Sequence, residues 1–351
     1  MIILNGKYNQ AVCYSDNPDP RSSEAIVNIC NQKYSEGNMI RIMPDVCYDG
    51  GNSVVGFTMQ MPDCIALDIE YASGCGVYCA RLSDNSPDLA ELDRICHEIP
   101  HGAEIWETPI ADFNINLALC ARALPWQNLY LRSFVTLGGG NHFIEVDADE
   151  EQNYYLVIHS GGGLFSHDVF NYYKNKHSGA QLIQGDDRSE YLHDMSVCVK
   201  YAEQNRKRIG RYICDKLKLT ITDEFDCVHH YFDIKRNIAR HGAASAEAGE
   251  RVIIPINMRD GCILATGKGN PEWNYSAPHG AGRIMSRMTA RDTLTMEDYR
   301  AQTEGLFSTT VNEDTLDEAP MAYKPAEMIL PYIEETVTID RILKPVFNFK
   351  P

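Results

Sequence analysis

The amino-acid sequence predicts an α+β fold, and three observations lead to that class. Strand-like and helix-like segments are mixed along the chain without the regular strand–helix–strand alternation of a parallel sheet. The chain has no internal repeat and no linker rich in proline, glycine or serine. Its 351 residues are sufficient to bury a large hydrophobic core. We therefore expect one compact domain over residues 1–351.

The strands are expected where β-branched or alternating apolar runs are interrupted by turn residues. Residues 1–80 have this character throughout, so short strands and turns are predicted there. A strand pair is expected around residues 133–149 and 153–163. The remaining strands are predicted at residues 250–258, 262–269 and 337–350, and those within the first 80 residues at 38–46, 53–59 and 64–71.

Three segments have helical patterns. Residues 84–99 predict a helix with Ser86 and Pro87 at its start. The longest helical pattern covers residues 189–217, with apolar positions at helical spacing. A third helix is expected to begin at Thr295, where Thr295 and Asp298 match a capping box.

The composition is that of a soluble globular protein, with 44% apolar and 23% charged residues. The first residues lack a basic segment followed by an apolar one, so we expect no signal peptide. No apolar run approaches the ~18 residues that cross a bilayer. The twelve cysteines have no repeated short spacing, which favours reduced thiols and a cytoplasmic protein.

The net charge of −17 argues against nucleic-acid binding, which usually requires a basic surface. Residues 174–176 and 205–211 are the only dense basic runs that could supply a local one.

The zinc protease motif and two common nucleotide-binding motifs are excluded. Residues 97–101 read His-Glu-Ile-Pro-His, the spacing of a zinc protease motif, but Pro100 should end the helix inside the motif. No Walker-type loop and no Gly-x-Gly-x-x-Gly run is present.

The stretch "NYSAPHGAGRIMSR", residues 274–287, sets His279 beside a run of small residues, with Arg283 and Arg287 following. One interpretation is a glycine turn with a histidine facing solvent. The other is a site in which small residues let a bulky charged ligand approach the imidazole. This stretch alone favours the turn.

Other polar residues fall where strands meet glycines. Cys75 lies between two glycines, whereas Cys79 has the environment of a core residue. His142 lies where a glycine run becomes a strand, His159 ends an apolar strand before glycines, and His229 follows an apolar pair, so three separate strand ends each bring a histidine to a glycine-rich opening. Individually each suits a core or turn position, but together a thiol and three imidazoles suit a divalent metal such as zinc or manganese, with cobalt or nickel possible in place.

Taken together, these segments resemble the RtcB family of GTP-dependent RNA ligases over essentially the whole chain. The matching blocks, in the order of the family, are "IMPDVCYDGGNSVVG", "SGCGV", "TLGGGNHFIEV", "VIHSGGG", "YAEQNR", "CVHHY", "GAASAEAGE", "APHGAGRIMSR", "DEAPMAYKP" and "FNFK". The segments containing His142 and His279 are the most specific.

The resemblance implies a compact RtcB-like domain around a central metal and GTP cleft. It implies that His279 attacks the α-phosphate of GTP and becomes guanylylated. GMP then passes to an RNA 3′-phosphate, or to an opened 2′,3′-cyclic phosphate, and a 5′-hydroxyl displaces it. Arg283 would hold phosphates, Asp45 is the third implied catalytic residue, and the glycines would leave room for the phosphates.

The remaining implied site residues divide into two sets. The implied metal ligands, for one or two Mn²⁺ ions, are Cys75, His142, His159 and His229. The implied GMP pocket consists of Asn141, Phe143, Glu145, Asn257, Met258, Gly280, Ala281, Gly282, Tyr323 and Lys350. RNA ends are the implied substrate, with no membrane contact and no reading of DNA sequence.

The chain departs from the family pattern at several positions, as expected of a divergent member. Ala72 stands where the family has a metal-binding aspartate, and either Asp68 or Glu70 could replace it. We therefore expect one tightly bound metal, on Cys75, His142 and His159, and a weaker second one. The other departures are Cys47 for histidine, Gly163 for arginine, His230 for asparagine, His241 for lysine, and Asn257 and Cys262 for serine.

Three functions remain open from the sequence. The first is the RNA ligase described above. The second is a catalytically reduced homologue that binds nucleotide or RNA ends without sealing them. The third is a guanylyltransferase or hydrolase acting on another phosphorylated acceptor, which the charge of −17 and Gly163 favour.

Overall fold

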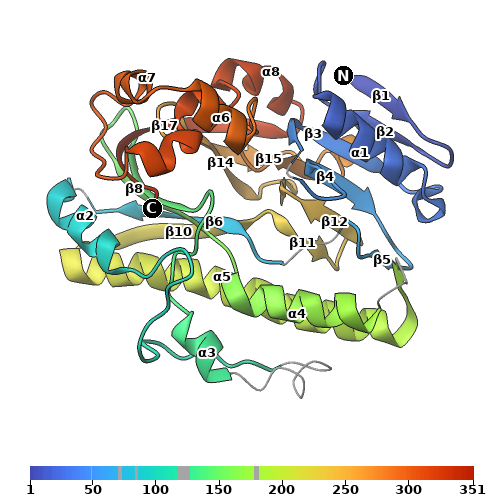
Figure 1. The fold of residues 1–351 in the computed structure, drawn as a ribbon, viewed down its shortest axis with the longest axis horizontal. Helices are drawn as coiled ribbons and strands as arrows, with labels where there is room; N and C mark the ends of the chain where they lie inside the picture. Colours follow the sequence, from blue (N-terminus) through green and yellow to red (C-terminus); the bar gives the residue numbers. More distant parts are fainter. Residues whose placement is uncertain (49, 70–72, 84–85, 117–126, 178–181) are drawn as a thin grey trace.

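The computed structural model describes the chain except for residues 49, 70–72, 84–85, 117–126 and 178–181, and it contains two large sheets (Figure 1). Strands and helices are mixed as expected, which confirms the α+β class. Within the described residues, no helix is long and apolar enough to cross a membrane.

The first sheet has six strands in the order β1-β2-β3-β4-β12-β11. β2 and β3 are parallel, and the other neighbours are antiparallel. The strands are β1 (Ile2–Asn5), β2 (Gln10–Cys13), β3 (Ile40–Cys47), β4 (Val55–Gln60), β12 (Ile238–His241) and β11 (His230–Asp233).

The second sheet has seven antiparallel strands in the order β10-β6-β8-β7-β17-β15-β14. The strand pair and the final strand predicted from the sequence form the centre of this sheet. The strands are β10 (Ile221–Val228), β6 (Gly76–Leu82), β8 (Tyr154–Ser160), β7 (Phe143–Ala148), β17 (Val337–Phe349), β15 (Gly261–Gly267) and β14 (Arg251–Asn257). Two short pairs complete the strands: β13 (Ala243–Ser245) with β16 (Ser276–Pro278), and β5 (Ile65–Ala66) with β9 (Leu182–Ile183).

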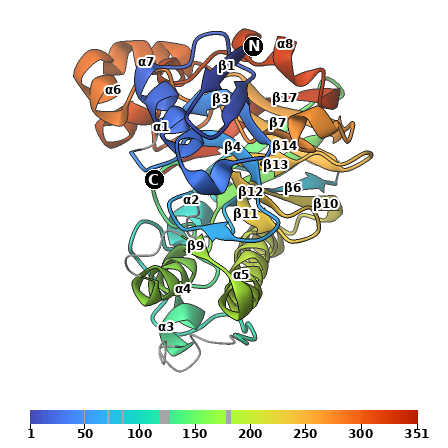
Figure 2. The ribbon, with the colours of Figure 1, turned by 90° about the vertical axis from the view of Figure 1, so that its right-hand side faces the viewer.

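Helices α4 (Gly163–Lys176) and α5 (Gly185–Leu217) pack side by side below the seven-stranded sheet in both views (Figures 1 and 2). Helix α5 contacts β6 and β8, and its buried face includes Cys198, Tyr201 and Ile209. The α-helices within the described residues are α1 (Pro20–Cys30), α2 (Leu89–Glu98), α3 (Gln127–Arg132), α4 (Gly163–Lys176), α5 (Gly185–Leu217), α6 (Arg287–Thr293), α7 (Met296–Gln302) and α8 (Leu330–Ile333).

Predicted helix starts and ends were right in part. Thr295 is the N-cap of α7 and accepts from the amide of Asp298, as expected. α2 ends at Glu98, before Pro100, which supports the exclusion of a zinc protease. However, Asp88 rather than Ser86 caps α2, because its carboxylate accepts from the amides of Ala90 and Glu91.

The prediction of strands and turns alone over residues 1–80 was wrong, because α1 lies within this segment. Asp19 caps α1 and Pro20 occupies its first position, both strong helix-start signals. Ala25, Ile26 and Ile29 then form one buried face against β1 and β2. The strand predicted at 64–71 is also wrong: β5 has only two residues, and 70–72 lie outside the described residues.

Candidate active site

His279 and Asp45 form a hydrogen-bonded pair between two elements that are distant in sequence. Asp45 lies near the end of β3 and is fully buried, and His279 directly follows β16. Oδ2 of Asp45 accepts from Nδ1 of His279 at 2.6 Å and from its backbone amide at 3.1 Å. The carboxylate therefore places the ring proton on Nδ1 and leaves Nε2 with a free lone pair. An imidazole in this state is a competent nucleophile.

The loop after His279 is held tightly against β3. Gly282 has a φ of 73°, and a Cβ at this position would overlap the backbone carbonyl of Asp45. Lys324 fixes the same contact, because its Nζ donates to the carbonyls of Pro44 and Val46, both at 2.8 Å. The lack of a side chain at Gly282 thus allows close packing against Asp45, a reason different from the expected space for phosphates.

Cys75, His142 and His159 converge beside this pair. Sγ of Cys75 lies 3.2 Å from Nε2 of His159 and 3.7 Å from Nε2 of His142. The three ligand atoms lie within 4.8 Å of one another, close enough to share one ion. Cys75 precedes β6, His142 precedes β7 and His159 lies near the end of β8. Because these strands are neighbours in one sheet, their ends bring the three side chains together.

Backbone carbonyls orient both imidazoles of this cluster. Nδ1 of His142 donates to the carbonyl of Leu137 at 2.8 Å, and Nδ1 of His159 donates to that of Asn141 at 3.1 Å. Both Nε2 atoms therefore present lone pairs toward Cys75, which is the arrangement of histidine ligands in metal sites. The chemistry and geometry of the three residues fit a divalent metal.

Burial controls the protonation of the cluster. It lowers the pKa of His142 to about 4 and that of His159 well below its usual range, so both rings are neutral near pH 7. Burial also raises the pKa of the Cys75 thiol to about 11, partly opposed by the charge of Arg206. A bound cation would have to displace the thiol proton.

His229 connects this cluster to His279. It follows β10, and its Nε2 lies 3.3 Å from Nε2 of His159. The ring centroids of His229 and His279 are 4.7 Å apart. The four residues predicted as metal ligands and the predicted nucleophile are therefore brought together.

Helix α5 supplies supporting residues that the sequence reasoning missed. Arg206 is fully buried, pairs with Asp226 at 2.7 Å, and donates to the carbonyls of Gly74 and Ser160, next to Cys75 and His159. Asn205 accepts from the amides of Val135 and Thr136 and so fixes the turn that leads to His142. The block "YAEQNR" contained both residues, and their place on the buried face of a helix was the available signal.

Three residues of the basic run at 205–211 form ion pairs with acidic residues of the protein. Lys207 and Arg211 both pair with Glu224, at 2.5 and 3.0 Å, and Arg206 is buried. Arg206 is therefore removed from any local nucleic-acid patch, Lys207 and Arg211 are partly neutralised by Glu224, and Arg208 is exposed.

His159, His229 and His279 line a cleft of about 1190 Å³ between the two sheets. Asp45 and His142 lie behind its wall, while the other predicted catalytic and metal residues line it. All residues predicted for the nucleotide pocket also line the cleft: Asn141, Phe143, Glu145, Asn257, Met258, Gly280, Ala281, Gly282, Tyr323 and Lys350.

A buried ion-pair network forms one wall of this cleft. Nζ of Lys350 lies 2.5 Å from Glu318, which also pairs with Arg287 and accepts from the hydroxyl of Tyr323. Burial alone would raise the pKa of Glu318, but Lys350 and Arg287 lower it to about 2. Arg283 donates to Tyr323 at 3.2 Å and to two backbone carbonyls, so most of its guanidinium is engaged within the protein.

A second buried cluster, Glu145, Asp147 and Cys262, was not anticipated. Glu145 accepts from Asn348 at 2.7 Å and lies 3.6 Å from the thiol of Cys262. Burial and the neighbouring Asp147 raise the pKa of Glu145 well above its usual range, and burial raises that of Asp147 to about 6. Both shifts favour the protonated form of the carboxyl, and the shift is the larger one at Glu145.

The positions at which the chain departs from the family pattern lie in different parts of the structure. Oδ2 of Asp68 accepts from the hydroxyl of Tyr34 at 2.7 Å, and Asp68 does not line the cleft. Ala72 and Glu70 lie outside the described residues. His230 and His241 are cross-strand partners with ring centroids 4.0 Å apart, and both line the cleft.

The fold and this site define an α+β protein in which a carboxylate-held histidine faces a thiol and imidazole cluster in a deep cleft. The family model described as tRNA-splicing ligase RtcB matches residues 126–351. The chain belongs to the RtcB family.

Curated relatives agree with this family. The RNA-splicing ligase RtcB of Escherichia coli K12 is 27% identical over 372 residues, covering 89% of this chain and 90% of that protein. RNA-splicing ligase RtcB1 of Escherichia coli ATCC 25922 is 26% identical over 371 residues, with the same coverage. The tRNA-splicing ligase RtcB of Aeropyrum pernix is 24% identical over 274 residues, covering 59% of this chain and 56% of that protein.

Proposed function

We propose that the protein is an RNA ligase that joins 3′-phosphate or 2′,3′-cyclic phosphate ends to 5′-hydroxyl ends through a GMP adduct of His279. The observation that carries this proposal is the Asp45–His279 pair at 2.6 Å, set against His229 and the thiol–imidazole cluster. Family membership and the names of the relatives support the same reaction.

His279 is the nucleophile of this proposal, and Asp45 is its positioning residue. Nε2 of His279 forms a bond to the α-phosphorus of GTP as the bond to the β-phosphate oxygen breaks, and pyrophosphate leaves. An oxygen of the RNA 3′-phosphate then takes the GMP group and frees the ring. The 5′-hydroxyl finally attacks the activated phosphate and releases GMP. Asp45 keeps the proton on Nδ1, so that Nε2 stays available.

The nucleotide would lie against β7, β14 and β17. Phe143 and Tyr323 offer aromatic faces for the base, and Lys350 and Glu145 offer polar groups. Arg283 acts mainly by fixing Tyr323 and the loop after His279, because its donors are largely engaged there. We assign all of residues 1–351 to this one catalytic domain.

Cys75, His142 and His159 would hold a divalent metal, with His229 available to a second. Such an ion supplies charge neutralisation of the phosphate and the leaving group when bound. Manganese is the ion we assign by family resemblance.

The experiment uses GTP labelled at the α-phosphate, with manganese and no RNA. Wild-type protein should acquire label, and His279→Ala should acquire none. His193→Ala is the matched control, because His193 is exposed on α5 and outside the cleft. Absence of label in the wild type would contradict the proposal.

A guanylyltransferase for another acceptor is the second candidate, favoured by the charge of −17 and by Gly163 in place of an arginine. RNA with a 3′-phosphate separates the two. Sealing to a 5′-hydroxyl strand supports the ligase, whereas labelled protein that seals no RNA supports the second candidate.

A further inference from the structure

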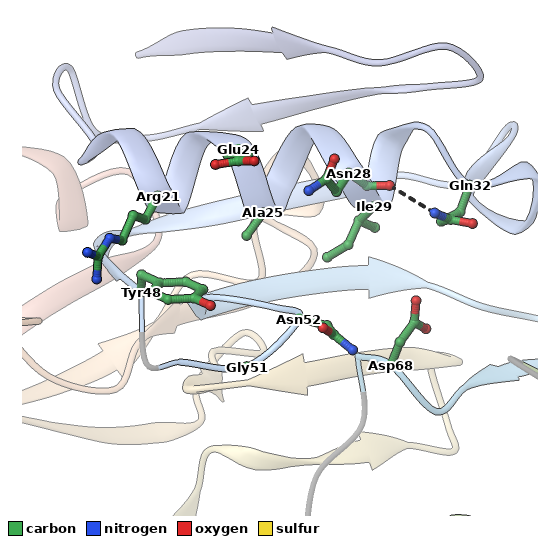
Figure 3. Close-up of a pocket in the computed structure, with 10 residues that line it drawn as sticks. All are labelled: Arg21, Glu24, Ala25, Asn28, Ile29, Gln32, Tyr48, Gly51, Asn52 and Asp68. Atoms are coloured by element: carbon green, nitrogen blue, oxygen red, sulfur yellow. Dashed lines mark hydrogen bonds between the residues drawn. The ribbon is translucent and has the colours of Figure 1, made fainter. Parts of the chain in front are cut away.

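A second cavity of about 650 Å³ lies between α1 and the segment that follows β3 (Figure 3). One side is formed by α1 and Gln32, and the other by Tyr48, Gly51 and Asn52 after β3 together with Asp68. The lining residues are Arg21, Glu24, Ala25, Asn28, Ile29, Gln32, Tyr48, Gly51, Asn52 and Asp68.

This cavity lies next to the active-site cleft. Arg21 and Tyr48 line both spaces, so they mark the junction between them. Tyr48 is only three positions beyond Asp45, which holds His279. A chain molecule whose end reaches His279 can therefore extend into this cavity.

The lining is chemically suited to a nucleobase. Tyr48 is 37% exposed, and stacking on aromatic rings binds bases of any sequence. Asn28, Asn52 and Gln32 offer both donors and acceptors. Oδ1 of Asp68 is buried and has no hydrogen-bond partner in the described part of the chain, whereas its Oδ2 accepts from Tyr34. An N–H group of a base would satisfy that oxygen.

The charge distribution also places an RNA contact here. In the run at 205–211, Arg206 is buried and Lys207 and Arg211 pair with Glu224, and Lys176 pairs with Asp187 at 2.7 Å. Arg21 is exposed on α1, and its side chain makes no ion pair among the residues the structure describes. It stands at the junction where a phosphodiester would pass between the two spaces.

We propose that this cavity binds one nucleotide of single-stranded RNA next to the end that is joined, with Tyr48 stacked on the base and Arg21 on the phosphodiester. This inference rests on the proposed function, because it names where the RNA substrate of the cleft is held. The strand could be the one ending in the 3′-phosphate or the one beginning with the 5′-hydroxyl.

The test measures binding of short fluorescent RNA by anisotropy, without GTP or added metal, so that it does not depend on catalysis. Two oligonucleotides are used, one with a 3′-phosphate and one with a 5′-hydroxyl, each also made with an abasic nucleotide near the reacting end. Tyr48→Ala should weaken the binding of one of the two intact RNAs about tenfold, whereas Tyr48→Phe should bind both RNAs as the wild type does. Phe307→Ala is the control, since Phe307 is 38% exposed and lies outside both spaces.

The abasic RNA provides the decisive comparison. In the wild type, loss of the base should weaken binding about as much as Tyr48→Ala does, and the two losses should not add. Equal binding of intact RNA by the wild type and Tyr48→Ala, additive losses, or no binding of either RNA by the wild type would overturn the inference. If the wild type seals RNA and Tyr48→Ala binds RNA as tightly as the wild type does, this binding site is rejected while the proposed ligase stands. Normal base-dependent binding without GMP labelling would reject the proposed ligase alone.

Discussion

Asp45 and His279 lie 234 positions apart in the chain and share a hydrogen bond of 2.6 Å between Oδ2 and Nδ1. The same carboxylate oxygen accepts from the backbone amide of His279 at 3.1 Å. One buried group thus fixes both the backbone and the ring, which defines which nitrogen can react.

Asp45→Asn should reduce GMP labelling of His279 by about 10²–10⁴-fold without unfolding the protein, by analogy with the loss of a histidine-orienting carboxylate elsewhere. The amide can donate to Nδ1 and thereby favour the unreactive tautomer. Initial labelling rates together with circular dichroism check this. Labelling at the wild-type rate would show that the carboxylate does not control the ring.

Gly282→Ala should reduce labelling and lower the free energy of unfolding by about 1–3 kcal/mol. Its φ of 73° is unfavourable for alanine, and the new Cβ would overlap the carbonyl of Asp45. Gly305→Ala separates the two causes, because Gly305 has a φ of 85° but no atom within 4 Å of an added Cβ. In denaturant unfolding, Gly305→Ala should lose less free energy of unfolding than Gly282→Ala, and its GMP labelling should be normal. Equal losses of labelling in the two variants would contradict this explanation.

The apo protein should bind one divalent ion tightly and a second only weakly. Cys75, His142 and His159 form a convergent set, whereas Asp68 is hydrogen-bonded to Tyr34 and lies away from the cleft. Calorimetric metal titration measures both affinities, and Cys75→Ser should abolish tight binding. Two equivalent tight sites without nucleotide would show that another group completes the second site.

Acid should destabilise the fold through Glu318. Its pKa is about 2 in the fold, below the ordinary value of 4.5, mainly because Lys350 and Arg287 outweigh its burial. A lowered pKa contributes stability above pH 4.5, and that contribution is lost as the pH falls toward 2. Glu318→Gln should flatten this part of the unfolding profile and cost about 3–5 kcal/mol near pH 7, because Lys350 would keep a buried charge without its partner.

The matched control for Glu318 is Glu91→Gln. Glu91 pairs with Arg94 on the surface of α2, where solvent screens the interaction. Its unfolding profile against pH should resemble that of the wild type. An unchanged profile for Glu318→Gln would show that the buried network does not set acid stability.

Much of the site could be predicted because its residues sit at strand ends with clear patterns. β7 and β8 were expected as a pair, and their pairing brings His142 and His159 to one edge. The blocks shared with the family then pointed to Cys75, His229 and His279. What the sequence could not supply was the distance between Asp45 and His279, which depends on how β3 and β16 pack.

The supporting residues were harder to predict because burial changes their meaning. Arg206 belongs to a basic run that suggested a surface, yet it is fully buried and pairs with Asp226 across the fold. Glu145 and Asp147 alternate along β7 as ordinary strand residues, and only the fold shows that Cys262 joins them from β15, which lies beyond β17 in the same sheet. α1 was missed because its start signals at Asp19 and Pro20 also occur in turns.

The central claim is that His279 is the covalent nucleophile, and peptide mass mapping tests it most directly. The protein is incubated with GTP and manganese, digested under neutral conditions and analysed for a GMP adduct. The account predicts one adduct, on the peptide that contains His279, and its loss in His279→Ala. An adduct on any other residue, or one that persists in His279→Ala, would contradict it.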